Sequence, residues 1–113
     1  MKRFIFFSLV ILSACTVDEK IQVPEKLISS DKIIPIIVDL QVLESHYQRL
    51  YNRPDLYRVA LDSSSSLVFQ NYDVTKADFE KSFAYYSSDL KVIYSIYEAA
   101  LDSINFRINL TSF

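Results

Sequence analysis

Residues 29–52 read SSDKIIPIIVDLQVLESHYQRLYN and hold the clearest helical pattern in the chain. Ser29, Ser30 and Asp31 are N-cap candidates, and Pro35 falls in the first turns, where a missing backbone N–H costs least. The pattern predicts an amphipathic helix that begins near Ser29 and buries one side. The apolar residues on that side recur every three or four positions: Ile33, Ile36, Ile37, Leu40, Leu43, Tyr47 and Leu50.

A second long helix is expected near the C-terminus, again with one apolar and one polar side. We expect this helix, like the first, to be half buried. Between the two, Asn52 is a cap candidate and Pro54 suits a first helical position, which predicts a helix that runs to about Tyr72. The serine run 63–66 contains poor helix formers and leaves open a loosened turn there. The predicted C-terminal stripe comprises Leu90, Ile93, Tyr97, Leu101, Ile104 and Ile108.

A further helix start is indicated by Thr75 and Asp78, whose spacing resembles a capping box. The chain contains no glycine and only three prolines, so it lacks the usual residues of tight hairpin turns. We therefore expect an all-α fold, a small bundle of about four helices in residues 29–113, and no sheet.

The N-terminus has the order of a secretory leader. Lys2 and Arg3 precede a short apolar stretch that, as a helix, would reach only about 14 Å, less than half of a ~30 Å hydrocarbon core. The stretch ends in Leu12-Ser13-Ala14-Cys15, which resembles a bacterial lipobox, and Cys15 is the only cysteine. The motif predicts a signal peptide at residues 1–14, cleavage between Ala14 and Cys15, and a lipidated tether at residues 15–28.

The lipobox resemblance also implies where in the cell the protein is located. In that pathway the thiol of Cys15 receives a diacylglycerol and the freed amine is usually acylated, so fatty chains such as palmitate hold the protein on a membrane. Thr16 stands where inner-membrane retention uses aspartate, which favours the outer membrane. Asp18 and Glu19 resemble an acidic surface-export signal but also suit a solvated tether. The periplasmic and surface faces both remain open.

Net charge excludes one class of partner. The formal charge is -2 for the whole chain, and loss of Lys2 and Arg3 leaves ten basic residues against fourteen acidic ones. A mildly acidic chain without a basic cluster has no electrostatic footprint for nucleic acid, since that binding depends on lysine and arginine neutralising phosphates. We expect no nucleic-acid partner.

Several segments of the chain carry a family resemblance through the residues Pro24, Lys26, Leu27, Ile28, Asp31, Asp39, Leu40, Glu44, Tyr72, Asp73, Val74, Thr75, Asp78, Phe79, Ser82, Tyr85, Tyr86, Ile96 and Tyr97. Together these residues resemble the domain of unknown function 4296 family, which comprises small lipoproteins of Bacteroidota. The resemblance spans nearly all of the mature chain and is most specific from Tyr72 to Tyr86. Asp73 stands where such a turn commonly has glycine, so this residue is expected to need a positive φ. The family implies an envelope lipoprotein with a helical domain and brings no established activity.

Candidate chemistry is sparse. His46 is the only histidine, and Glu44 lies two positions away, which places the two side chains on different helix faces. No catalytic residue, metal ligand or cofactor is therefore predicted. The eight tyrosines offer flat apolar faces with polar tips, and we take Tyr85, Tyr86 and Tyr94 as a candidate interaction surface.

The sequence leaves two functions in view. The first is a non-enzymatic, membrane-anchored interaction module that docks another envelope protein. The alternative is an accessory lipoprotein that captures a glycan or peptide on a tyrosine-rich surface. A flat exposed apolar patch would favour the partner, whereas a deep tyrosine-lined pocket would favour the ligand. The oligomeric state is not indicated by the sequence.

Overall fold

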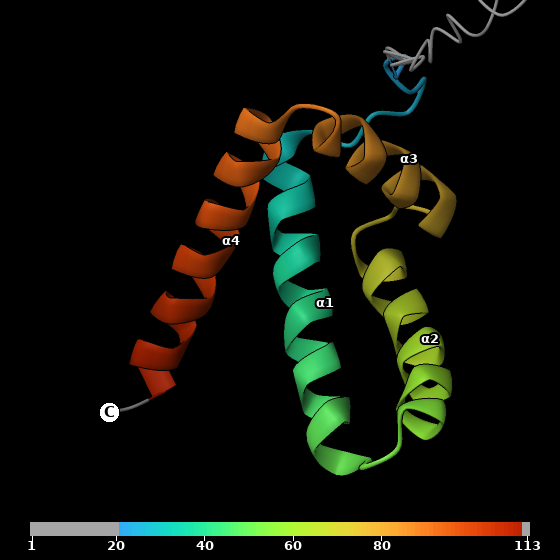
Figure 1. Ribbon diagram of the computed structural model, residues 1–113, viewed down its shortest axis with the longest axis vertical. Coiled ribbons are helices and arrows are strands. Elements are labelled where there is room, and N and C mark those ends of the chain that lie inside the picture. Colours follow the sequence, from blue (N-terminus) through green and yellow to red (C-terminus); the bar gives the residue numbers. More distant parts are fainter. Residues whose placement is uncertain (1–20, 112–113) are drawn as a thin grey trace, which may run out of the picture.

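A computed structural model describes residues 21–111 and confirms the all-α prediction. The described chain forms four helices: α1 (Ser30–Leu50), α2 (Pro54–Asn71), α3 (Lys76–Ser87) and α4 (Leu90–Thr111). Figure 1 shows α1 in the centre with α2 and α4 on either side, while the short α3 crosses one end. The predicted signal peptide and lipobox cysteine lie outside the described residues.

The core is concentrated at the α3 end of the molecule. Helix α1 begins as predicted, because the Ser29 carbonyl accepts hydrogen bonds from the N–H groups of Lys32 and Ile33. The first half of α1 contains the buried residues of this helix, whereas Leu50 at its other end is exposed. Burial of this apolar set is the main stabilising term of so small a domain. The buried apolar residues are Ile28, Ile33, Ile36, Ile37, Val38, Phe69, Ile96 and Ala100.

Helix α2 begins at the predicted Pro54, but its N-cap lies one residue later than predicted. Arg53, and not Asn52, is the N-cap residue, while Pro54 occupies the predicted first position. The serine run 63–66 does not break the helix. The hydroxyl groups of Ser63, Ser65 and Ser66 donate to backbone carbonyls three or four residues earlier, so these polar side chains are satisfied within the helix.

The turn from α2 to α3 confirms the expectation for Asp73, which has a φ of 55°. The Val74 N–H donates to the Phe69 carbonyl and the Asp73 N–H to the Gln70 carbonyl. This pair of bonds is a Schellman motif, in which one residue must take the left-handed conformation. Asp73 fills the place that glycine usually takes, and the motif reverses the chain tightly enough for α3 to start at once.

Side chains cap the two following helices. The Thr75 hydroxyl accepts a hydrogen bond from the Asp78 N–H at 3.0 Å, which confirms the predicted cap of α3. The Asp89 carboxylate accepts from the N–H groups of Lys91 and Val92 and caps α4 in the same way. The Thr75 cap fixes the start of α3 after the turn from α2, and the Asp89 cap fixes the corner between α3 and α4.

The predicted buried side of α4 is correct only in part: Ile104 of the predicted stripe packs against the core, but the helix is rotated relative to the prediction. Ile96 and Ala100 are buried against the core, whereas Leu90, Tyr97 and Leu101 of the predicted stripe are exposed. The small side chain of Ala100 is directed toward the core, and its small volume allows α1 and α4 to pack closely. The helical period was correct, but two adjacent stripes of α4 are apolar and the sequence pattern favoured the outer one.

The last residue of the predicted tether belongs to the folded domain. Ile28 is buried, and its N–H donates to the hydroxyl of Ser82 at 3.0 Å. Its carbonyl accepts from the Tyr86 hydroxyl at 2.7 Å. Both backbone groups of Ile28 are thus held by α3, more than fifty residues further along the chain. This three-residue clamp fixes the point at which the chain enters the domain.

Candidate functional site

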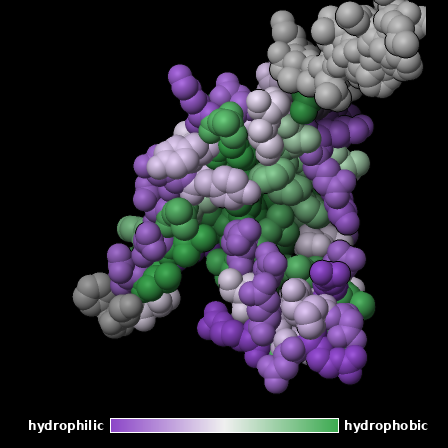
Figure 2. Space-filling view, in the orientation of Figure 1, coloured by the Kyte–Doolittle hydropathy of each residue, from purple (hydrophilic) through white to green (hydrophobic). Residues whose placement is uncertain are grey.

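A hollow of about 290 Å³ lies under α3, where all four helices meet. Figure 2 shows apolar surface gathered in the middle of this face, while hydrophilic residues cover the end of the α1–α2 hairpin. We call this hollow the aromatic groove. Its apolar lining comprises Ile37, Leu40, Leu61, Phe69, Phe79, Phe83 and Tyr97.

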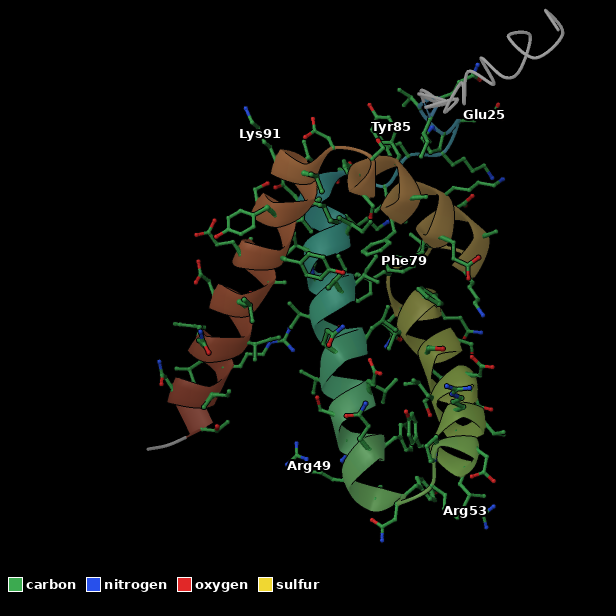
Figure 3. The ribbon with its side chains drawn as sticks, viewed as in Figure 1. Glu25, Arg49, Arg53, Phe79, Tyr85 and Lys91 are labelled. Atoms are coloured by element: carbon green, nitrogen blue, oxygen red, sulfur yellow. The ribbon has the colours of Figure 1, made fainter. Side chains whose placement is uncertain are left out.

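Four rings of the aromatic groove form a ladder from α2 through α3 to α4. The ring centroids of Phe69 and Phe79 lie 5.2 Å apart, those of Phe79 and Phe83 5.9 Å, and those of Phe83 and Tyr97 6.3 Å. These spacings are typical of favourable aromatic pairs. In Figure 3, Phe79 lies beneath α3, between α1 and α2. The ladder gives the groove a rigid apolar wall.

The rim of the aromatic groove is acidic. Glu44 of α1, Asp62 of α2 and Glu80 of α3 line it, together with a single cation, Lys76. Lys76 lies 4.0 Å from Glu80, and both side chains are largely exposed, so this pair contributes little to stability. Glu44 and Asp62 form no ion pair within residues 21–111. The rim therefore presents uncompensated negative charge beside an apolar floor.

An exposed apolar strip on α4 continues the groove. It comprises Leu90, Tyr94, Tyr97 and Leu101, and we call it the α4 stripe. The four residues follow one another at spacings of four, three and four, which places them on one helix face. Tyr97 belongs to both features, and Leu101, 59% exposed, lies one turn further along. The apolar surface thus extends from the hollow along α4.

A polar cluster joins three helices at Asp39. The Tyr72 hydroxyl donates to one carboxylate oxygen at 2.6 Å, and Arg107 donates to the other at 3.0 Å. The hydrogen bond to Asp39 is the main cause that raises the pKa of Tyr72 above 10.0. Burial and the charge of Asp39 also raise this pKa, and the charge of Arg107 lowers it. The cluster ties α2 and α4 to the middle of α1.

The raised pKa of Tyr72 predicts a contribution to stability at alkaline pH. Because the folded-state pKa exceeds the unfolded one, the contribution is complete below the unfolded value near pH 10. It is lost as pH rises through the folded-state pKa. We expect the wild type to lose more stability than Tyr72→Phe between about pH 9 and pH 11.5, measured by urea denaturation. Parallel pH profiles for the two proteins would contradict this assignment.

The three tyrosines predicted as an interaction surface do not line the aromatic groove. The Tyr86 hydroxyl donates a hydrogen bond to the Ile28 carbonyl. Burial is the main cause that raises the pKa of Tyr86, and the charge of the neighbouring Tyr85 raises it further. The Tyr85 ring packs edge-on against Tyr86 at 5.7 Å, at the α3 end of the molecule (Figure 3). Tyr94 is exposed on α4 and belongs to the α4 stripe. Of the three, Tyr94 is the one continuous with the groove.

Other candidate chemistry does not converge in the described region. His46 is exposed on α1, and its ring lies edge-on to Tyr47 at 5.6 Å. Within residues 21–111, no three histidine, cysteine, aspartate or glutamate side chains lie close enough together to hold a metal ion. In the same residues, every helix is too short or too polar to span a bilayer.

Comparison with known families gives the identity of the domain. A family model described as Domain of unknown function (DUF4296) matches residues 24–109. The chain belongs to the DUF4296 family. The match begins just before Ile28, so the DUF4296 domain includes the clamped entry segment. Neither the curated proteins nor the solved structures contain a match to this chain.

Most of the residues that carry the DUF4296 resemblance have structural roles. Ile28, Ser82 and Tyr86 form the entry clamp, and Tyr72 bonds to Asp39. The segment 73–78 forms the turn and cap between α2 and α3. A smaller set lines the aromatic groove: Leu40, Glu44, Phe79 and Tyr97. Sequence reasoning did not find the groove, because its walls come from four separate helices.

Proposed function

We propose that this DUF4296 protein is a lipid-anchored envelope lipoprotein whose helical domain docks another envelope protein. The observation that carries the proposal is the aromatic groove together with the α4 stripe. Leu90 is 82% exposed and Tyr94 69% exposed, on the same face of α4 as Tyr97, which lines the hollow. Contiguous exposed apolar surface with a polar rim is typical of protein–protein interaction sites.

The dimensions of the groove support a protein partner over capture of a small ligand. A volume of about 290 Å³ lies just below the range of about 300–1,000 Å³ for pockets that bury a small molecule. One tyrosine, Tyr97, lines the hollow, so it lacks the tyrosine-rich character of the alternative hypothesis. An open hollow of this kind accepts anchoring side chains from a larger surface.

The proposed anchor sets where the docking surface lies. Ile28 lies thirteen positions after Cys15, so the tether can span at most about 45 Å. At roughly 0.8 kcal/mol per buried methylene group, two or three acyl chains would hold the chain durably on a membrane. The entry clamp lies at the α3 end, and the α1–α2 hairpin points away from it (Figure 1). We infer that the groove is presented within reach of other membrane-anchored proteins.

Site-specific photocrosslinking in the native envelope tests the docking function. A photoreactive residue at position 101, on the α4 stripe, is expected to give a discrete crosslinked product. The same residue at position 59 is the matched control, because Val59 is 69% exposed. It lies on the opposite side of α2 from the groove-lining Leu61. Equal crosslinking at both positions, or none at position 101, would remove the support for a docking surface.

A further inference from the structure

We propose that the aromatic groove binds a basic amphipathic helix of the partner protein. This inference rests on the proposed docking function and specifies the chemistry of the occupant. Three observations support it: the arrangement of the helices, the position of the apolar surface and the charge of the rim. Each of these favours one feature of the partner segment.

The arrangement of the helices favours a helical occupant. Helix α1 packs against both α2 and α4, which flank it, and α3 closes one end (Figure 1). Packed helices lie about 8–10 Å apart, so α2 and α4 are no more than about 20 Å apart across α1 near α3. That span accommodates one further helix of about 10 Å diameter over α1. Among residues 21–111, no long helix fills this position, which a fourth long helix takes in a four-helix bundle.

The position of the apolar surface favours an amphipathic helix. Phe79 and Phe83 form the closed end of the groove, and Tyr97 and Leu101 follow one another along α4. Apolar side chains spaced three or four residues apart on the partner would meet these two surfaces in register. The opposite side of such a helix would face solvent and must be polar.

The charge of the rim favours a basic helix. Three carboxylates and one ammonium group line the groove, and the single cation, Lys76, is already paired with Glu80. Glu44 and Asp62 lie on the α1 and α2 side, opposite the apolar α4 stripe. Lysine or arginine residues along one edge of the partner helix would therefore face these carboxylates. Charge complementarity of this kind sets partner choice and orientation more than raw affinity.

Two synthetic helical peptides test the inference. Both are 18-residue amphipathic designs with the same leucine face; the first has a lysine edge and the second a glutamate edge. The protein is residues 15–113 with Cys15→Ser, which retains every described residue and cannot be lipidated. In fluorescence anisotropy, we expect the lysine peptide to bind at least about tenfold more tightly than the glutamate peptide at low salt.

Matched variants locate the binding surface. We expect Leu101→Lys and Asp62→Lys each to weaken binding of the lysine peptide by about tenfold or more. Substitutions of anchoring side chains and of facing charges have effects of this size. Val59→Lys and Asp102→Lys make the same changes at exposed positions outside the groove lining and should alter binding by less than about twofold. Circular dichroism of all four variants confirms that the exposed substitutions leave the helices intact.

Several outcomes would overturn the inference. Equal binding of the two peptides, preference for the glutamate peptide, or equal loss in the control variants would each exclude a basic helix in the groove. Concentration-dependent dimerisation that Leu101→Lys abolishes would assign the surface to a second copy of the chain. If crosslinking at position 101 succeeds while the lysine peptide fails, docking stands and the partner chemistry is wrong. If both fail, the docking function itself falls.

Discussion

Replacing Ile36 with alanine is expected to lower the free energy of unfolding by about 2–5 kcal/mol. Ile36 is fully buried on α1, at the α3 end where the core is concentrated. The substitution removes apolar surface and leaves a cavity that the surrounding helices fill only in part. Because small domains are stabilised by only about 5–15 kcal/mol in total, this loss would unfold a large fraction of the protein on mild heating. Urea denaturation followed by circular dichroism measures the change.

Leu50→Ala is the matched control for the core substitution. Leu50 lies on the same helix but is 60% exposed at the far end. Its replacement is expected to change stability by no more than about 0.5 kcal/mol. Equal losses for the two variants would mean that the core is not concentrated in the first half of α1.

Replacing Ser82 with alanine is expected to lower the free energy of unfolding by about 1–3 kcal/mol, although the change removes one oxygen atom. Ser82 is fully buried, and its hydroxyl accepts the hydrogen bond from the Ile28 N–H. Without that acceptor, a buried donor has no partner, and the cost of its desolvation is not recovered. Hydrogen exchange at the Ile28 amide should accelerate more than exchange in the middle of α1.

Ser88→Ala serves as the control for the entry clamp. The Ser88 hydroxyl also makes one hydrogen bond, to the Tyr85 carbonyl, but Ser88 is exposed and water can replace the lost partner. A change of no more than about 0.5 kcal/mol is expected. If Ser82→Ala were as mild as Ser88→Ala, Ile28 would not be held by α3 as described.

Local features of the fold were predictable from the sequence because they depend on residues close together in the chain. The three-to-four spacing in residues 29–52 indicated α1, and Pro54 marked the start of α2. The need for a positive φ at Asp73 and the cap at Thr75 were also predicted correctly. Each of these follows from backbone sterics or from a hydrogen bond within a few residues.

Long-range features were not predictable in the same way. The clamp joins Ile28 to Ser82 and Tyr86, and no periodicity connects such distant positions. The buried side of α4 was predicted only in part because its two apolar stripes have similar composition, and packing of Ile96 and Ala100 toward the core distinguishes them. The aromatic groove is assembled from all four helices, so its recognition required their arrangement.

The positions of the three predicted surface tyrosines also depend on how the helices pack. Residue type alone suggested that Tyr85, Tyr86 and Tyr94 could form one surface. In the fold, Tyr86 holds the chain entry and Tyr85 packs on it, while Tyr94 faces outward on α4. Phenylalanine side chains, which were not part of the predicted interaction surface, form most of the aromatic ladder.

The intact mass of the chain recovered from the source organism tests most directly the claim on which the docking proposal depends, namely export and lipidation at Cys15. We expect a product that lacks residues 1–14, begins at Cys15, and carries the added mass of a diacylglycerol group with or without a further acyl chain. A product that retains Met1 or the leader, or whose Cys15 thiol is unmodified, would contradict a lipid-anchored envelope module.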